Sequence, residues 1–218
     1  DVSAVLGSFF VVRKVDVLAC GGWDDAVFAR HFTVLNLCLT LQSQGKRHIW
    51  TPVTSVVHQS KKTVELFASD PRLNLEWHDT MLAERDQMLE TWHESLAHDP
   101  NYNRHLSLQK PFDVEHQIVI DWQPKRQEKL RILGLPISSG AGMYRVIDPL
   151  NALQDQGLAQ SCLIMPIDSK SMRRLMPLEL ARAKPDTLLL QHSIDEHQQA
   201  SINKFRLIHP NLFIVQTV

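Results

Sequence analysis

Cysteine is scarce in this sequence of 218 residues, which contains only Cys20, Cys38 and Cys162. The three cysteines are odd in number, lie far apart and form no CxxC pair. This usage disfavours both a disulfide scaffold and a zinc site. It fits a reducing compartment, so we expect a cytoplasmic location.

An excess of one sign of charge is also lacking, because 23 lysines and arginines balance 24 aspartates and glutamates to a net charge of −1. Such a chain has no general attraction for nucleic acid or anionic lipid, and we expect neither as a partner. The apolar runs are short and interrupted, so no transmembrane segment is predicted. No secretory signal is recognisable. Peripheral association with the inner membrane stays open.

What the sequence does contain is typical of a globular protein. Hydrophobic residues make up 44% of the chain and charged residues 22%, which is close to the usual composition. The length suits one large domain or two small ones. The chain begins at Asp1 without a methionine and ends within the apolar run LFIVQTV, so we expect it to be an excerpt of a longer protein.

The first half alternates apolar extended segments with helical patterns. A helix is predicted where apolar residues recur at i, i+3 and i+4 spacing, and Gly45 follows one such pattern as a C′ residue. Gly21 and Gly22 predict a turn. The predicted elements are strands at 5–12 and 47–57 and helices at 32–43 and 74–97.

The second half has a different pattern, in which apolar runs alternate with helical stretches. Alternation at this spacing predicts βαβ units and a parallel sheet. The predicted strands are 130–136, 161–166, 187–191 and 212–217, and the predicted helices lie near 143–156, 170–183 and 195–208.

Several motifs of the first half occur in the order found in family 2 glycosyltransferases, which are inverting enzymes of the GT-A fold. They are GSFFVVRK (7–14), GGWDD (21–25), LNLCLTLQSQGKRHIWTP (35–52), His58 and TWHESLAHDPNYNRHLSL (91–108). The last of these is similar to a segment near the end of bacterial surface-polysaccharide glycosyltransferases. The resemblance covers about residues 5–112 and implies the acceptor-side half of such a domain.

The resemblance also locates the base that would deprotonate the acceptor hydroxyl, a carboxylate just before the helix that contains LNLCL. Thr33 and Val34 stand there instead, with Val34 at the position of the base, and Asn36 replaces a later acidic residue. None of the three can act as a base. The catalytic residue is therefore unknown, and the nearby substitutes are Asp24, Asp25 and His31. The sequence also explains Asp24 and Asp25 as residues that cap or orient the turn. Thr33 has an alternative role as helix N-cap.

Two further roles follow from the resemblance. Trp23 and Asp24 are expected to bind the acceptor, with packing in the core as the alternative for Trp23. His58 is expected to ligate a divalent metal, Mn²⁺ or Mg²⁺, that holds the nucleotide diphosphate, with a satisfied or solvent-facing histidine as the alternative. Its partners would come from an Asp-x-Asp motif, which this sequence does not contain.

One loop of the second half is glycine-rich. Small residues there would let backbone N–H groups approach a phosphate or sugar at a helix N-terminus. Because Arg145 stands where a dinucleotide fingerprint has its third glycine, NAD binding is not expected. The segment LPISSGAGMYRVIDPLNALQDQG (135–157) instead resembles the opening of a GT-B glycosyltransferase, with a tight packing turn as the alternative. The candidate ligand residues are Ser139, Gly140, Gly142, Tyr144, Arg145 and His192.

Together these features predict an α/β protein, in which a partial GT-A-type segment precedes a Rossmann-like parallel sheet. The predicted boundaries are 1–117 for the first module, 118–129 for a linker and 130–218 for the second module. The expected function is a part of a transferase that moves a sugar from a nucleotide-sugar to a saccharide hydroxyl in surface polysaccharide (O-antigen-like) synthesis. By itself the chain is expected to be inactive. The alternatives are a degenerate acceptor-binding or assembly module, and an unrelated α/β small-molecule domain.

Overall fold

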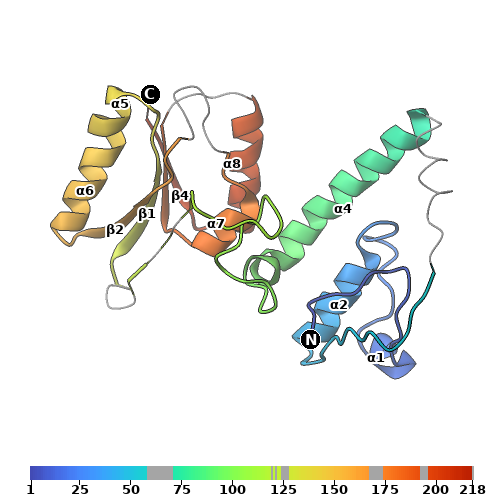
Figure 1. Ribbon diagram of the computed structural model, residues 1–218. Coiled ribbons are helices and arrows are strands. Elements are labelled where there is room, and N and C mark those ends of the chain that lie inside the picture. The colour runs from blue at the N-terminus through green and yellow to red at the C-terminus, as the bar shows by residue number, and fades with distance from the viewer. Residues whose placement is uncertain are drawn as a thin grey trace. The chain divides into compact units, whose positions relative to one another are not determined.

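The computed structural model describes residues 1–57, 71–118, 120, 122–123, 128–166, 174–191 and 196–217. They form two compact units, Asp1–Asn103 and Arg104–Val218 (Figure 1). Residues 104–117, which the family resemblance assigns to the first module, therefore belong by their contacts to the second unit.

The first unit contains the helices α1 (Lys14–Ala19), α2 (Thr33–Ser43) and α4 (Pro71–Ala97). The helices predicted at 32–43 and 74–97 are thus confirmed as α2 and α4. Gly45 is confirmed as a C′ residue, because it has a φ of 77° and Lys46 beyond it donates a hydrogen bond to the carbonyl of Leu41. None of the described helices has the length and the apolar character that crossing a membrane requires.

The strands predicted at 5–12 and 47–57 are wrong. Phe10 and Val12 pack beside the α1–α2 contact, while Leu6 and Val11 are exposed. A strand requires a hydrogen-bonded neighbour as well as an apolar pattern. Among the described residues the only pairing of these segments is a single antiparallel bridge from His48 to Val2.

The core of the first unit lies between α2 and α4. Leu39 of α2, Met88 of α4 and Phe28 of the preceding loop are each at most 4% exposed and form one cluster. A second cluster joins α2 to α1 through Leu37 and Val17. Helix α2 is therefore packed on two sides, and its remaining surface can face a ligand.

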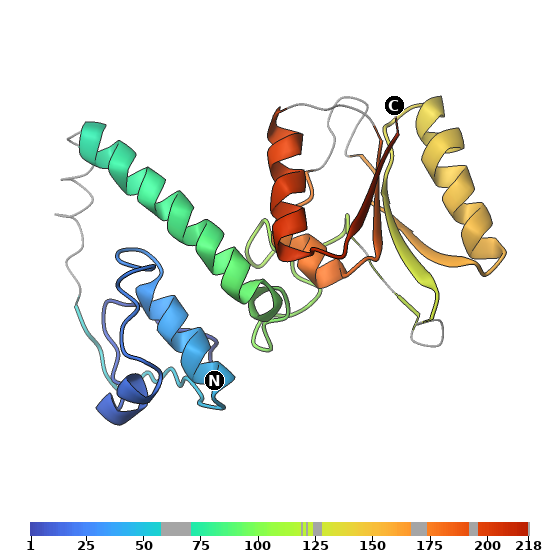
Figure 2. The same cartoon turned by 180° about the vertical axis from the view of Figure 1, so that it is seen from behind.

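The second unit is built on a parallel sheet, as the sequence predicts, with the strand order β2-β1-β3-β4. Helices cover both faces of this sheet, so that the unit has three layers (Figures 1 and 2). Its strands are β1 (Leu130–Leu135), β2 (Ala159–Leu163), β3 (Thr187–Gln191) and β4 (Phe213–Thr217), and its helical segments are α5 (Gly140–Gly142), the π-helical turn η2 (Met143–Ile147), α6 (Asp148–Asp155), α7 (Pro177–Ala183) and α8 (Glu196–Ile208).

Each face of the sheet has its own apolar core. Leu133 and Leu188 point to the side of α7 and α8, whereas Ile132 packs with Val146 and Leu150 on the side of α6. This alternation follows from the two-residue period of a strand. The β2 strand begins two residues earlier than predicted, and part of the helix predicted at 170–183 lies outside the described residues.

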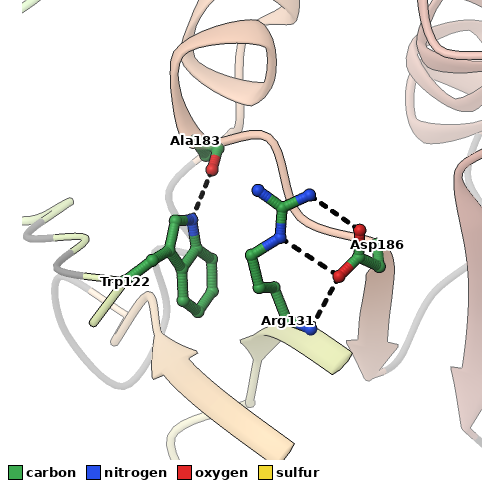
Figure 3. Close-up of polar contacts among 4 residues, drawn as sticks. All are labelled: Trp122, Arg131, Ala183 and Asp186. Carbon is green, nitrogen blue, oxygen red and sulfur yellow. Dashed lines mark hydrogen bonds and ion pairs between the residues drawn. The ribbon is translucent and has the colours of Figure 1, made fainter. Parts of the chain in front are cut away.

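The amino end of the sheet is closed by polar contacts (Figure 3). The Arg131 guanidinium lies 2.7 Å from one Asp186 oxygen, and the backbone N–H of Arg131 donates to the other at 2.8 Å. The hydrogen bond from the Arg131 side chain outweighs burial and lowers the pKa of the Asp186 carboxyl. Trp122, inside the predicted linker, donates its indole N–H to the carbonyl of Ala183.

Candidate functional site

The first unit has a pocket of about 390 Å³ between the end of α1, one side of α2 and the last turns of α4. Its volume lies within the range of about 300–1,000 Å³ that is usual for small-molecule sites. The lining residues are Cys20, Gly21, Gly22, Trp23, Asp24, Thr33, Asn36, Leu37, Thr40, Thr91 and Trp92.

The two glycines shape one wall of this pocket. Gly21 and Gly22 have φ values of 95° and 85°, which side chains rarely tolerate. The N–H of Gly22 donates to the carbonyl of Val17 at 2.9 Å and ends α1. The chain turns back at this point and places Trp23 and Asp24 on the pocket wall, so the predicted turn is confirmed.

Trp23 is an exposed aromatic wall of the pocket. Its side chain is 45% exposed, and its ring meets Phe10 edge-on with the ring centres 6.1 Å apart. The indole is thus supported by packing against Phe10, while part of its surface stays open to solvent. A ring held in this way can stack on the apolar face of a ligand.

Asp24 has a local structural role as well. One of its carboxylate oxygens accepts the N–H of Val27 at 3.3 Å, and its carbonyl accepts the N–H of Phe28 at 2.9 Å. Asp24 therefore shapes the turn, as the sequence also allows, and among the described residues that line the pocket it is the one acid. Asp25, a second substitute base, is exposed and does not line the pocket, and neither does His31, the third.

Four residues of α2 reach the pocket at helical spacing, namely Thr33, Asn36, Leu37 and Thr40. Val34 is not among them. A Cβ atom added to Gly7 would lie 3.1 Å from a methyl group of Val34, so the Val34 side chain faces that segment. Of the acidic pair that the resemblance expects at 33 and 34, only residue 33 lies on the pocket.

The polar groups of α2 are engaged with the protein. The hydroxyl of Thr33 donates to the carbonyl of Phe28, and the N-cap residue of α2 is Phe32, so the alternative role of Thr33 as N-cap is wrong. The amide oxygen of Asn36 accepts the indole N–H of Trp92 at 2.8 Å. Trp92 is a pocket residue that the sequence alone does not single out, because it packs against the cluster of Phe28, Leu39 and Met88 and lines the pocket only through its place beside α2.

The described part of the chain contains no cluster of side chains that could bind the metal expected from the resemblance. No group of three or more histidine, cysteine, aspartate or glutamate side chains gathers there as a cation would require. His58, the residue proposed as a ligand, lies outside the described residues.

The glycine-rich loop of the second unit follows β1 at the carboxyl end of the sheet. The strand order places β2 on one side of β1 and β3 on the other, and ligands of open α/β sheets bind where the order divides in this way. A Cβ atom on Gly142 would lie 2.1 Å from the carbonyl oxygen of Ile137, so this position excludes a side chain. Gly142 is thus required for packing of the loop, whatever else it does.

The other candidate residues of this loop are exposed. They include Ser139, Gly140, Tyr144 and Arg145, and the Arg145 guanidinium lies 5.6 Å from the centre of the Tyr144 ring. Gln191, at the end of β3, is 1% exposed and accepts the N–H of Ile137 at 3.3 Å. His192 lies outside the described residues.

Comparison with known proteins found no similar family model, curated protein or solved structure. The likeness to glycosyltransferases therefore rests on the motifs of the sequence.

Proposed function

We propose that the chain is part of a glycosyltransferase that moves a sugar from a nucleotide-sugar donor to a saccharide hydroxyl in the synthesis of a surface polysaccharide. In this proposal the first unit belongs to the acceptor side of a GT-A-like module. The second unit is the first half of a GT-B-like module. The observation that carries the proposal is the pocket of the first unit, because it gathers Trp23, Asp24, Thr33 and Asn36, four positions that the motifs single out.

The chemistry of the pocket suits a neutral saccharide. A pyranose presents an apolar face beside a ring of hydroxyl groups. Trp23 offers an aromatic surface for the former, and Thr40, Thr91 and the Asn36 amide offer hydrogen-bonding groups for the latter. The described residues of the lining include one carboxylate and no basic side chain, so they do not favour an anionic ligand.

Transfer also requires a base for the acceptor hydroxyl, since a positioned carboxylate assists attack by removing the proton. Asp24 is the best placed candidate. Its only hydrogen bond from a backbone N–H within the described residues is the long one from Val27, and it lies on the pocket wall. Asp25 is a weaker candidate because it does not line the pocket.

A second candidate function is saccharide binding without transfer. It is favoured by Thr33 and Asn36 of α2, which stand where the resemblance expects acidic residues. Both are uncharged, and each is already hydrogen-bonded within the protein, Thr33 to the Phe28 carbonyl and Asn36 to the Trp92 indole. In that case the first unit is a degenerate acceptor-binding module.

Saccharide binding is the property to test first. Saturation-transfer NMR with methyl glycosides of glucose, galactose, mannose and N-acetylglucosamine should detect binding of at least one of them to the whole chain. Trp23→Ala should abolish the saturation-transfer signal of the bound glycoside, because the substitution removes the aromatic surface on which the sugar would stack. Trp50→Ala is the matched control, since Trp50 is 70% exposed and lies away from the pocket.

Binding that survives Trp23→Ala, or no binding of any glycoside to the native chain, would contradict the proposal. A separate assay for release of nucleoside diphosphate from nucleotide-sugars should find no turnover by this chain, because the resemblance covers no donor-binding half. Turnover would show that the two units were wrongly assigned to module halves that do not bind the nucleotide-sugar donor.

A further inference from the structure

Glu84 is a buried carboxylate in the middle of α4, and it does not line the pocket. The side chain is 4% exposed. One carboxylate oxygen accepts the N–H of Arg30 at 3.0 Å, and the other accepts those of His31 and Phe32 at 2.9 and 3.1 Å. Three consecutive backbone donors thus converge on one acid from another helix.

These three donors lie immediately before the first residue of α2. Consecutive N–H groups that point to one place form a concave site for an anion, and negative charge near a helix N-terminus is stabilising. The N-cap residue Phe32 makes no capping hydrogen bond through its own side chain. Glu84 supplies from α4 the negative charge that a capping side chain would otherwise supply.

The carboxylate is ionised in this environment. Burial raises its pKa, but the hydrogen bonds from His31, Phe32 and Arg30 outweigh burial, and the pKa of Glu84 falls below its usual range. A smaller electrostatic contribution from the neighbouring His31 acts on the pKa of Glu84 in the same direction. The side chain of Arg30 turns instead to Glu76, at 3.3 Å on the surface of α4.

The loop held by Glu84 leads directly to the pocket. Thr33 follows Phe32, lines the pocket and bonds the carbonyl of Phe28. Two turns along α4 from Glu84, Trp92 donates to Asn36 and forms another part of the wall. Helix α4 is therefore hydrogen-bonded to the loop before α2 through Glu84 and to α2 itself through Trp92. Both contacts lie next to residues that line the pocket.

We propose that Glu84 is the positioning residue of this pocket: its charge holds the start of α2 so that Thr33 and Asn36 face the ligand. Glu84 itself touches no ligand. As a statement about a saccharide site the proposal rests on the function proposed above, but the geometry that it predicts can be measured without any ligand.

The variant Glu84→Gln tests the charge with little change in size. Its amide keeps one acceptor oxygen and turns an NH₂ donor toward backbone donors, so at least one N–H loses its partner. The matched control is Glu76→Gln. Glu76 lies on the same helix and its carboxylate contacts the Arg30 side chain at the exposed surface.

The measurement is the indole N–H resonance of Trp92, identified by its loss in Trp92→Phe. Glu84→Gln should displace this resonance, because the Asn36 contact shifts, while Glu76→Gln should leave it in place. The resonance of Trp122, which reports its bond in the second unit, should not move in either variant. An unchanged Trp92 resonance in a folded Glu84→Gln variant would overturn the proposal.

The native chain provides a second measurement if the variant does not fold. Because the pKa of Glu84 is below its usual range, the Trp92 resonance should stay constant down to about pH 4.3, the ordinary glutamate value, and move only below it. Movement at a higher pH, where a glutamate with a lowered pKa stays ionised, would overturn the proposal.

Glycoside binding separates this proposal from the function on which it rests. Where the native chain binds a methyl glycoside, Glu84→Gln should weaken binding roughly tenfold, as expected for loss of a hydrogen bond to a charged group. If the Trp92 resonance moves but no glycoside binds the native chain, the positioning role stands and the saccharide function fails. If Glu84→Gln binds the glycoside as tightly as the native chain does, the positioning role of Glu84 is contradicted, but the saccharide function is not.

Discussion

The two units hold their candidate sites in different ways. In the second unit, the loop after β1 is supported by a parallel sheet with an apolar core on each face. In the first unit, the helices around the pocket also pack through apolar clusters, but Glu84 and Trp92 of α4 add hydrogen bonds to the loop before α2 and to α2 itself. One site therefore depends on backbone pairing and apolar burial, and the other depends in addition on a few side-chain hydrogen bonds.

This contrast predicts where substitutions have their largest effect. Removal of apolar volume should destabilise the second unit strongly, whereas removal of single polar groups should alter the first unit modestly and change its pocket. The indole N–H resonances of Trp92 and Trp122 report the units separately, since each tryptophan forms its hydrogen bond within its own unit.

The largest effect is expected from Leu133→Ala in β1. Leu133 is fully buried in the core beside α7 and α8, and a leucine-to-alanine change in a core costs about 2–5 kcal/mol. Urea unfolding followed at Trp122 should show this loss, with the Trp92 signal unchanged. Leu130→Ala is the control in the same strand, because Leu130 is 48% exposed. Equal losses in the two variants would refute the assignment of the core.

A smaller effect is expected from Asn36→Ala in the first unit. The substitution leaves the indole N–H of Trp92 without its acceptor, which costs about 1–3 kcal/mol for a buried donor and less for this half-buried one. Urea unfolding followed at Trp92 measures the loss. The exposed Asn74 of α4 provides the control, since Asn74→Ala should cause no loss. No destabilisation in Asn36→Ala would mean that the Asn36–Trp92 contact does not support the pocket.

The smallest effect is expected from Asp186→Asn at the amino end of the sheet. The Asp186 side chain is 38% exposed, so solvent screens its pair with Arg131 and the loss should be below about 1 kcal/mol. The folded pKa of Asp186 is lowered, so its contribution is present above the unfolded pKa and is lost as the pH falls through the folded value. Stability of the second unit measured against pH should show this acid loss in the native chain and not in the variant.

Much of the second unit could be predicted from its sequence. The run TLLLQ coincides with β3, and the regular alternation of strands and helices leads to the observed parallel sheet. Such prediction succeeds because both faces of this sheet are covered, so that each strand appears as a short apolar run between turn residues.

The first unit was predicted less well, for two physical reasons. The segment 5–12 has the apolar pattern of a strand, yet a strand also needs a partner, which a local pattern cannot specify. The helix at 33–43 was predicted correctly because its apolar face is encoded within the segment itself. Its pocket face could not be distinguished from its packed faces without knowing where α1 and α4 lie.

The sequence by itself determined the periodic elements, the turn at Gly21–Gly22 and the mismatch at Thr33 and Val34. These features depend on neighbours within a few residues, through helical spacing, strand alternation and glycine conformation. Only the tertiary structure decided that Thr33 and not Val34 lines the pocket, and that Glu84 binds the loop before α2. Those facts depend on hydrogen bonds between residues more than fifty positions apart in the chain, and such contacts exist only once the helices have packed.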